Sequence, residues 1–109
     1  ITGGNLTLSE AFTNFDYIVI EFWDSGSIIY YATERIPTKI TNINVDPITQ
    51  VSKSSTGNTK FTFKVEADTT TNLIVHEAEH ITTTYGASAS IVRTAQTGYD
   101  VKTVYGYKL

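Results

Sequence analysis

Apolar and polar residues alternate through much of this chain, and the densest apolar run lies at residues 15–23. Within this run Ile18, Ile20 and Phe22 recur at every second residue, which is the side-chain period of a β-strand. The intervening positions are mixed in polarity: Tyr17, Val19, Glu21 and Trp23. We therefore predict a central strand that buries one face in a core and has its other face covered by a second layer, a neighbouring subunit or a ligand.

The next apolar run, at residues 28–33, follows a turn at residues 24–27 in which Gly26 can adopt a positive φ. This spacing predicts an antiparallel hairpin with the central strand. Residues on both faces of the return strand are apolar, so we predict that it occupies a central position and not an edge. The chain is then expected to leave the sheet at residues 34–37.

Residues 60–66 alternate most regularly. Phe61, Phe63 and Val65 are predicted to face inward, and Lys60, Thr62, Lys64 and Glu66 outward. This pattern predicts a solvent-facing outer strand, and the polar residues 54–59 before it predict an exposed loop. Further strands are predicted within residues 5–11, 39–51, 73–81, 90–94 and 99–107. About eight strands with this spacing predict an all-β fold, an antiparallel β-sandwich of the jelly-roll type.

The composition supports one cysteine-free β-domain. Its 109 residues are enough for a single core and too few for a second domain. Without cysteine, stability depends on that core or on association of several copies. Because the chain begins without Met and Gly3-Gly4 suits the end of a linker, we expect residues 1–109 to be one module of a longer protein.

The charge pattern and the length of the apolar runs argue against two classes of partner. The net charge is −3 and the eight basic residues are scattered, whereas nucleic-acid binding needs clustered Lys and Arg. No apolar run approaches the length of about 18 to 20 residues that a membrane span requires. We therefore expect neither a nucleic-acid partner nor membrane insertion.

One motif carries possible chemistry. His76-Glu77-Ala78-Glu79-His80 matches the zinc-hydrolase pattern, in which a helix presents two His to Zn²⁺ and the Glu activates water. The flanking residues are β-branched, and along a strand the two His would lie about 13 Å apart. A third ligand is also difficult to find, because Asp100 is the only side-chain carboxylate after His80. We predict a strand here, with no metal, no cofactor and no catalytic residue, and keep a zinc-dependent hydrolase as the third hypothesis.

Four aromatic residues are candidates for binding: Tyr17, Trp23, Tyr30 and Tyr31. Their rings can stack on sugars, and large aromatic side chains also occur in cores and at subunit interfaces. We therefore interpret them as a candidate ligand or interface surface.

The two ends of the chain resemble small β-sandwich modules in tail fibres and receptor-binding proteins of tailed bacteriophages. Residues 5–23, which read NLTLSEAFTNFDYIVIEFW, resemble the Leu-Ser strand, turn and aromatic-Asp step that open such modules. Residues 101–109, which read VKTVYGYKL, resemble their closing strand, which commonly lies at or near the C-terminus of the protein. The motif at residues 76–80 is not expected in these modules.

The resemblance implies a non-enzymatic component of the virion tail, at the C-terminal end of a longer protein. Its expected role is attachment to a host-surface glycan or protein, or fibre assembly with other virion tail subunits, often as a homotrimer. The alternative hypothesis is an extracellular carbohydrate-binding module of a secreted bacterial protein. A fibre shaft encoded before residue 1 would favour the first, and a catalytic domain the second.

Overall fold

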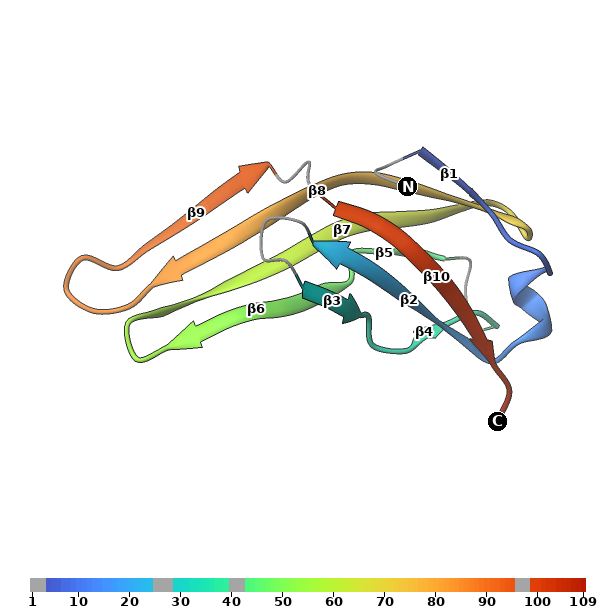
Figure 1. Ribbon diagram of the computed structural model, residues 1–109, viewed down its shortest axis with the longest axis horizontal. Coiled ribbons are helices and arrows are strands. Elements are labelled where there is room, and N and C mark those ends of the chain that lie inside the picture. The colour runs from blue at the N-terminus through green and yellow to red at the C-terminus, as the bar shows by residue number, and fades with distance from the viewer. Residues whose placement is uncertain (1–3, 25–28, 40–42, 96–98) are drawn as a thin grey trace.

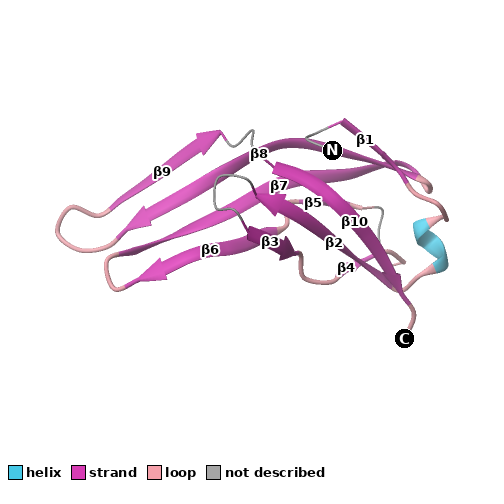
Figure 2. Cartoon of the chain, in the orientation of Figure 1, coloured by secondary structure: helices cyan, strands magenta, loops and turns pink. Residues whose placement is uncertain are grey.

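The chain forms two packed antiparallel β-sheets, as seen in a computed structural model that describes residues 4–24, 29–39, 43–95 and 99–109. Its elements are β1 (Gly4–Thr7), η1 (Phe12–Asn14), β2 (Tyr17–Asp24), β3 (Ile29–Ala32), β4 (Ile36–Pro37), β5 (Asn44–Val45), β6 (Ile48–Ser54), β7 (Gly57–Thr69), β8 (Asn72–Thr84), β9 (Ser90–Ala95) and β10 (Tyr99–Tyr107). Apart from the short helix η1, the ordered elements are strands (Figure 2). The predicted all-β sandwich is confirmed.

The larger sheet has the order β1-β8-β7-β5, with β6 also pairing with β7 and β9 with β8. Its centre is the hairpin of the two 13-residue strands β7 and β8. The prediction that residues 60–66 form an outer strand is wrong, because β7 has paired strands on both of its edges. The alternation of side chains shows which face of a strand is buried, but it does not show how many strands lie beside it.

The outer ends of β6, β7, β8 and β9 extend beyond the smaller sheet and form an arm, residues 50–60 and 81–95 (Figure 1, left). The predicted exposed loop at residues 54–59 is wrong, because only residues 55–56 turn and Gly57 already pairs with Thr84. A Cβ on Gly57 would lie 2.3 Å from the carbonyl oxygen of Thr83. Glycine at this position therefore leaves room for the backbone of β8 to lie close to the start of β7.

The smaller sheet has the order β10-β2-β3, with β4 also pairing with β2. The predicted hairpin pairing of β2 with β3 is confirmed, while its turn at residues 25–28 lies outside the described residues.

Two predictions about the smaller sheet are wrong. Among the described residues β3 pairs with β2 alone, so it is an edge, and residues 36–37 return to the sheet as β4 instead of leaving it. Strand β3 pairs with residues 21–24 of β2 and β4 pairs with residues 17–18, so the chain returns to β2 after a short gap.

The core lies between the sheets and follows the predicted alternation. Ile18, Ile20 and Phe22 of β2 are buried, as are the large-sheet residues Phe61, Phe63 and Val65. The Phe22 ring stacks on Phe61 at 4.9 Å and meets the edge of Phe63 at 5.2 Å. The inward rows of both sheets are therefore confirmed.

The outward row of β7 lies on the outer side of the sheet as predicted, but two of its residues are less exposed than expected. Lys64 is exposed and Lys60 is half-buried, but Thr62 is buried on the outer side of the sheet. Its paired neighbours are Ile48 of β6 and Glu79 of β8. A short side chain on a central strand is covered by longer side chains on both adjacent strands, which sequence alternation alone does not reveal.

Candidate binding face

The outer face of the smaller sheet gathers aromatic side chains from three strands. The register places Trp23 of β2 opposite Tyr30 of β3, and Tyr17 opposite Tyr107 of β10. Tyr105 lies opposite Val19 on the same face. We call these five aromatic residues the aromatic face: Tyr17, Trp23, Tyr30, Tyr105 and Tyr107.

Two clusters of rings make up the aromatic face. At one end Trp23 and Tyr30 lie 4.7 Å apart between ring centroids. At the other end Tyr17 stacks on Tyr107 at 5.0 Å, and the Arg35 guanidinium lies 4.6 Å from the centre of the Tyr17 ring. Tyr30 is 61% exposed, and Tyr105 and Tyr107 are each 42% exposed. Ring surface is therefore open to a ligand at both ends.

The fourth sequence candidate, Tyr31, lies apart from the others. It is opposite Phe22 in the register, so its ring points to the inner side of the sheet, where it packs 5.6 Å from the Phe22 ring. The structure thus places Tyr17, Trp23 and Tyr30 on one face, with Trp23 and Tyr30 in contact and Tyr17 at the other end, and it separates Tyr31 from them. It adds Tyr105 and Tyr107. These two tyrosines lie two residues apart in the last strand, and this spacing is the sequence pattern that could have placed them on one face.

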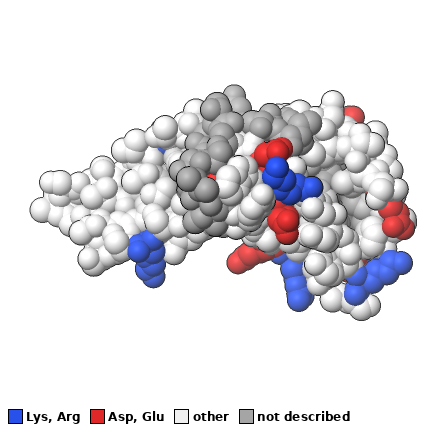
Figure 3. Space-filling model, viewed as in Figure 1, with Lys and Arg blue, Asp and Glu red and all other residues white. Residues whose placement is uncertain are grey.

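Charged groups lie among these rings. Lys102, beside the register shift in β10, donates a hydrogen bond to Asp100 at 2.9 Å, and this bond raises the pKa of Lys102 above its ordinary value. Glu21 of β2 is half-buried on the same face. Viewed as in Figure 1, the molecule gathers acidic and basic groups over the smaller sheet, while most of the arm surface is uncharged (Figure 3). The aromatic face combines ring surfaces with charged hydrogen-bonding groups.

The structure places the motif His76-Glu77-Ala78-Glu79-His80 within strand β8, as the sequence predicts. The pairing of β8 with β7 shifts register in this stretch: Phe63 lies opposite Ala78, but Val65 lies opposite Val75. Strand β8 therefore has one extra residue here, a β-bulge, which reverses the alternation of its side chains.

As a result, the two histidines point to opposite faces of the larger sheet. The His76 side chain is 40% exposed, and its Nε2 lies 3.4 Å from Oε1 of Glu66. His80 points toward the smaller sheet, where its ring meets Phe61 edge-on and its Nε2 lies 3.1 Å from Oδ2 of Asp24. A shared ion needs ligands that converge on one point, so this pair does not form a chelating site. Within the described ranges, no group of three or more His, Asp or Glu residues could hold a metal ion.

Asp24 is the residue of this region that the sequence interpretation placed incorrectly. It was expected in the turn, but it ends β2 and is fully buried. The inward row of Ile18, Ile20 and Phe22 continues to position 24 at the same two-residue spacing. This spacing is the sequence pattern that could have predicted the burial of Asp24. The contact between Asp24 and His80 joins the two sheets.

We expect no tight, stoichiometric binding of Zn²⁺ in isothermal titration calorimetry and no change in melting temperature when a chelator is added. The physical reason is the opposite orientation of His76 and His80 on one strand. A structural metal ion would contribute folding free energy and its removal would lower the melting temperature. Tight binding that disappears in His76→Ala would contradict this expectation and support the hydrolase hypothesis.

In comparisons with known proteins, no family model, curated protein or solved structure matches the chain. Within the part of the chain that the structure describes, no helix has the length and apolar character of a membrane span. The chemistry of the aromatic face and of the strand motif is therefore the basis for assigning a function.

Proposed function

We propose that this chain is a non-enzymatic attachment module of a bacteriophage tail, and that it binds a host-surface glycan through the aromatic face. The observation that carries the proposal is the exposure of Tyr30 beside the Asp100–Lys102 pair, with the exposed rings of Tyr105 and Tyr107 further along the same sheet face. The resemblance of residues 5–23 and 101–109 to tail-fibre modules supports the virion setting. Homotrimer formation and contact with other tail subunits remain predictions from that resemblance.

A sugar suits this face better than an obligate protein interface does. A sugar ring has apolar C–H faces that stack on aromatic rings and hydroxyl groups that pair with carboxylates and ammonium groups. The cores of protein interfaces are enriched in aromatic residues but depleted of Lys, Glu and Asp. Here Glu21, Asp100 and Lys102 lie on the same face as the rings. The mixture therefore favours a glycan over the buried surface of another subunit.

The test is a glycan array probed with the isolated chain, followed by affinity measurements on variants. Tyr30→Ala should weaken glycan binding by about tenfold, which corresponds to about 1.4 kcal/mol of lost binding free energy. Tyr85→Ala is the matched control, because Tyr85 is a tyrosine of similar exposure, 45%, that lies on the arm. This control should bind the glycan as the unaltered chain does.

The mass measured by light scattering separates a glycan site from a subunit interface. Under the proposal, Tyr30→Ala and Trp23→Ala leave the oligomeric mass unchanged while glycan affinity falls. If Trp23→Ala instead lowers the mass and makes the melting temperature depend on concentration, the face is a subunit interface and the glycan proposal is wrong. An array with no bound glycan would also contradict it.

A further inference from the structure

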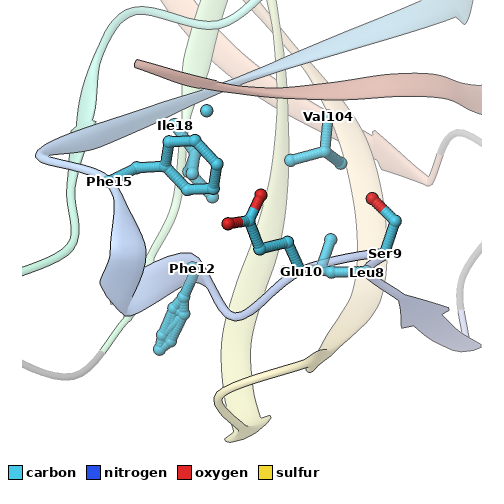
Figure 4. Close-up of a pocket in the computed structure, with 8 residues that line it drawn as sticks. Leu8, Ser9, Glu10, Phe12, Phe15, Ile18 and Val104 are labelled. Atoms are coloured by element: carbon cyan, nitrogen blue, oxygen red, sulfur yellow. The ribbon is translucent and has the colours of Figure 1, made fainter. Parts of the chain in front are cut away.

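A pocket of about 140 Å³ opens at the edge of the sandwich, apart from the aromatic face (Figure 4). Three segments form it: residues 8–15, which include η1, the start of β2, and the second half of β10. The apolar side chains that line it include Leu8, Phe15, Ile18 and Val104. A cavity of about 150 Å³ with apolar walls is large enough to hold a benzene molecule. The pocket can therefore receive an apolar group of that size.

The pocket wall is built where the end of β10 packs against the residues just before β2. Gly106 of β10 lies under the Phe15 ring, and a Cβ on this glycine would be 2.5 Å from Cγ of Phe15. The backbone N–H of Leu109 donates to Oδ2 of Asp16 at 2.6 Å, and the Asp16 N–H donates to the carbonyl oxygen of Tyr107 at 2.8 Å. These bonds hold β10 against the start of β2, so the pocket exists before any ligand enters.

Glu10 is the charged residue among the side chains that line this pocket. In Figure 4 its carboxylate extends between Phe15 and Val104. Asn14 donates a hydrogen bond from Nδ2 to Oε1 of Glu10 at 3.1 Å, which orients the carboxylate. Nζ of Lys108 lies 5.9 Å from the centroid of the Phe15 ring and supplies a positive charge there, so the positive charge of a ligand must be held by Glu10 and not by this ring. The electrostatic character of the pocket therefore favours a positively charged ligand.

We propose that this pocket binds a small organic ammonium ion. The apolar body of the ligand contacts Leu8, Ile18 and Val104, and its ammonium group pairs with the Glu10 carboxylate. A neutral ligand of the same shape gains the apolar contact but not the charge-assisted hydrogen bond, which is roughly twice as strong as a neutral one. An anion is repelled by Glu10. The site is independent of the glycan proposal, because it uses none of the residues of the aromatic face.

The experiment titrates the chain with three probes of similar shape, benzylammonium, benzyl alcohol and benzoate, and follows the backbone amide shifts by NMR. We expect benzylammonium to bind about tenfold more tightly than benzyl alcohol, and benzoate not to bind. The shifts should centre on residues around Leu8, Phe15 and Val104. Equal affinities for the three probes, or no shifts at these residues, would overturn the proposal.

Two variants and a control sharpen the test. Glu10→Gln keeps the size of the side chain and should abolish the preference for benzylammonium over benzyl alcohol. Val104→Phe should fill the pocket and block both probes. Glu34→Gln removes one charge from an exposed position that does not line the pocket and should leave the preference intact. An unchanged preference in Glu10→Gln would overturn the proposal, even if Val104→Phe fails to fold.

A further probe, n-butylammonium, distinguishes two sources of the ammonium group that the pocket binds. Its shape is that of the end of a lysine side chain, whereas benzylammonium represents a free primary amine that carries an aromatic ring. Tighter binding of n-butylammonium would assign the pocket to a lysine side chain of a partner protein. Tighter binding of benzylammonium would assign it to a small-molecule amine, and either result supports an ammonium site as long as Glu10→Gln weakens it.

Discussion

Phe63→Ala should lower the free energy of unfolding by about 3 to 5 kcal/mol, the range for truncating a fully packed phenylalanine. The Phe63 side chain is 1% exposed and lies at the centre of an aromatic cluster. Its ring lies 5.2 Å from Phe22, 5.7 Å from Phe61 and 6.0 Å from Tyr99. Because these rings come from β2, β7 and β10, truncation leaves a cavity at the contact between the two sheets.

The control is Lys64→Thr, one residue further along the same strand. The Lys64 side chain is 45% exposed and its ion pair with Glu66 is long, at 3.6 Å. We expect a change within about 0.5 kcal/mol in urea denaturation, as for most surface substitutions. Equal and small losses in Phe63→Ala and Lys64→Thr would show that the register of β7 is wrong. Thr62 is unsuitable as the outward control, because it is buried.

His80→Ala should destabilise the chain by about 3 kcal/mol, because it removes a partner of a buried carboxylate. Asp24 is fully buried, and its Oδ2 lies 3.1 Å from Nε2 of His80. A buried polar group that loses a hydrogen-bond partner has no bulk water to replace it. The lost contact also joins β2 to β8, so the effect acts on the packing of one sheet against the other.

His76→Ala is the matched control from the same motif. Its side chain is 40% exposed and its contact with Glu66 lies at the surface, so the expected loss is below about 1 kcal/mol. A double-mutant cycle of His80→Ala with Asp24→Asn should show a coupling energy of about 1 kcal/mol or more, as for residues in contact. Equal losses for His76→Ala and His80→Ala would contradict the opposite orientations that the β-bulge gives them.

Part of the candidate binding face could be predicted from residues alone. Tyr17 and Trp23 share the outward row of one strand, so the sequence placed them on one face. Tyr30 joins them and Tyr31 does not, because the hairpin register puts Trp23 opposite Tyr30. Tyr105 and Tyr107 reach the same face from the far end of the chain, since β10 pairs with β2. That pairing is a long-range contact, and no local pattern specifies it.

The sequence by itself determined most of the strands and the inward rows of β2 and β7. Strict alternation made Phe61, Phe63 and Val65 inward residues, and β-branched flanks made the motif at residues 76–80 a strand instead of a helix, since both depend on local backbone preference. Only the tertiary structure decided the rest. It made β3 an edge and β7 a central strand, and the β-bulge that separates His76 from His80 arises only where β8 pairs with β7. Strand order and register depend on contacts between segments that are distant in the sequence. The alternation of apolar and polar residues predicts only which face of each strand is buried.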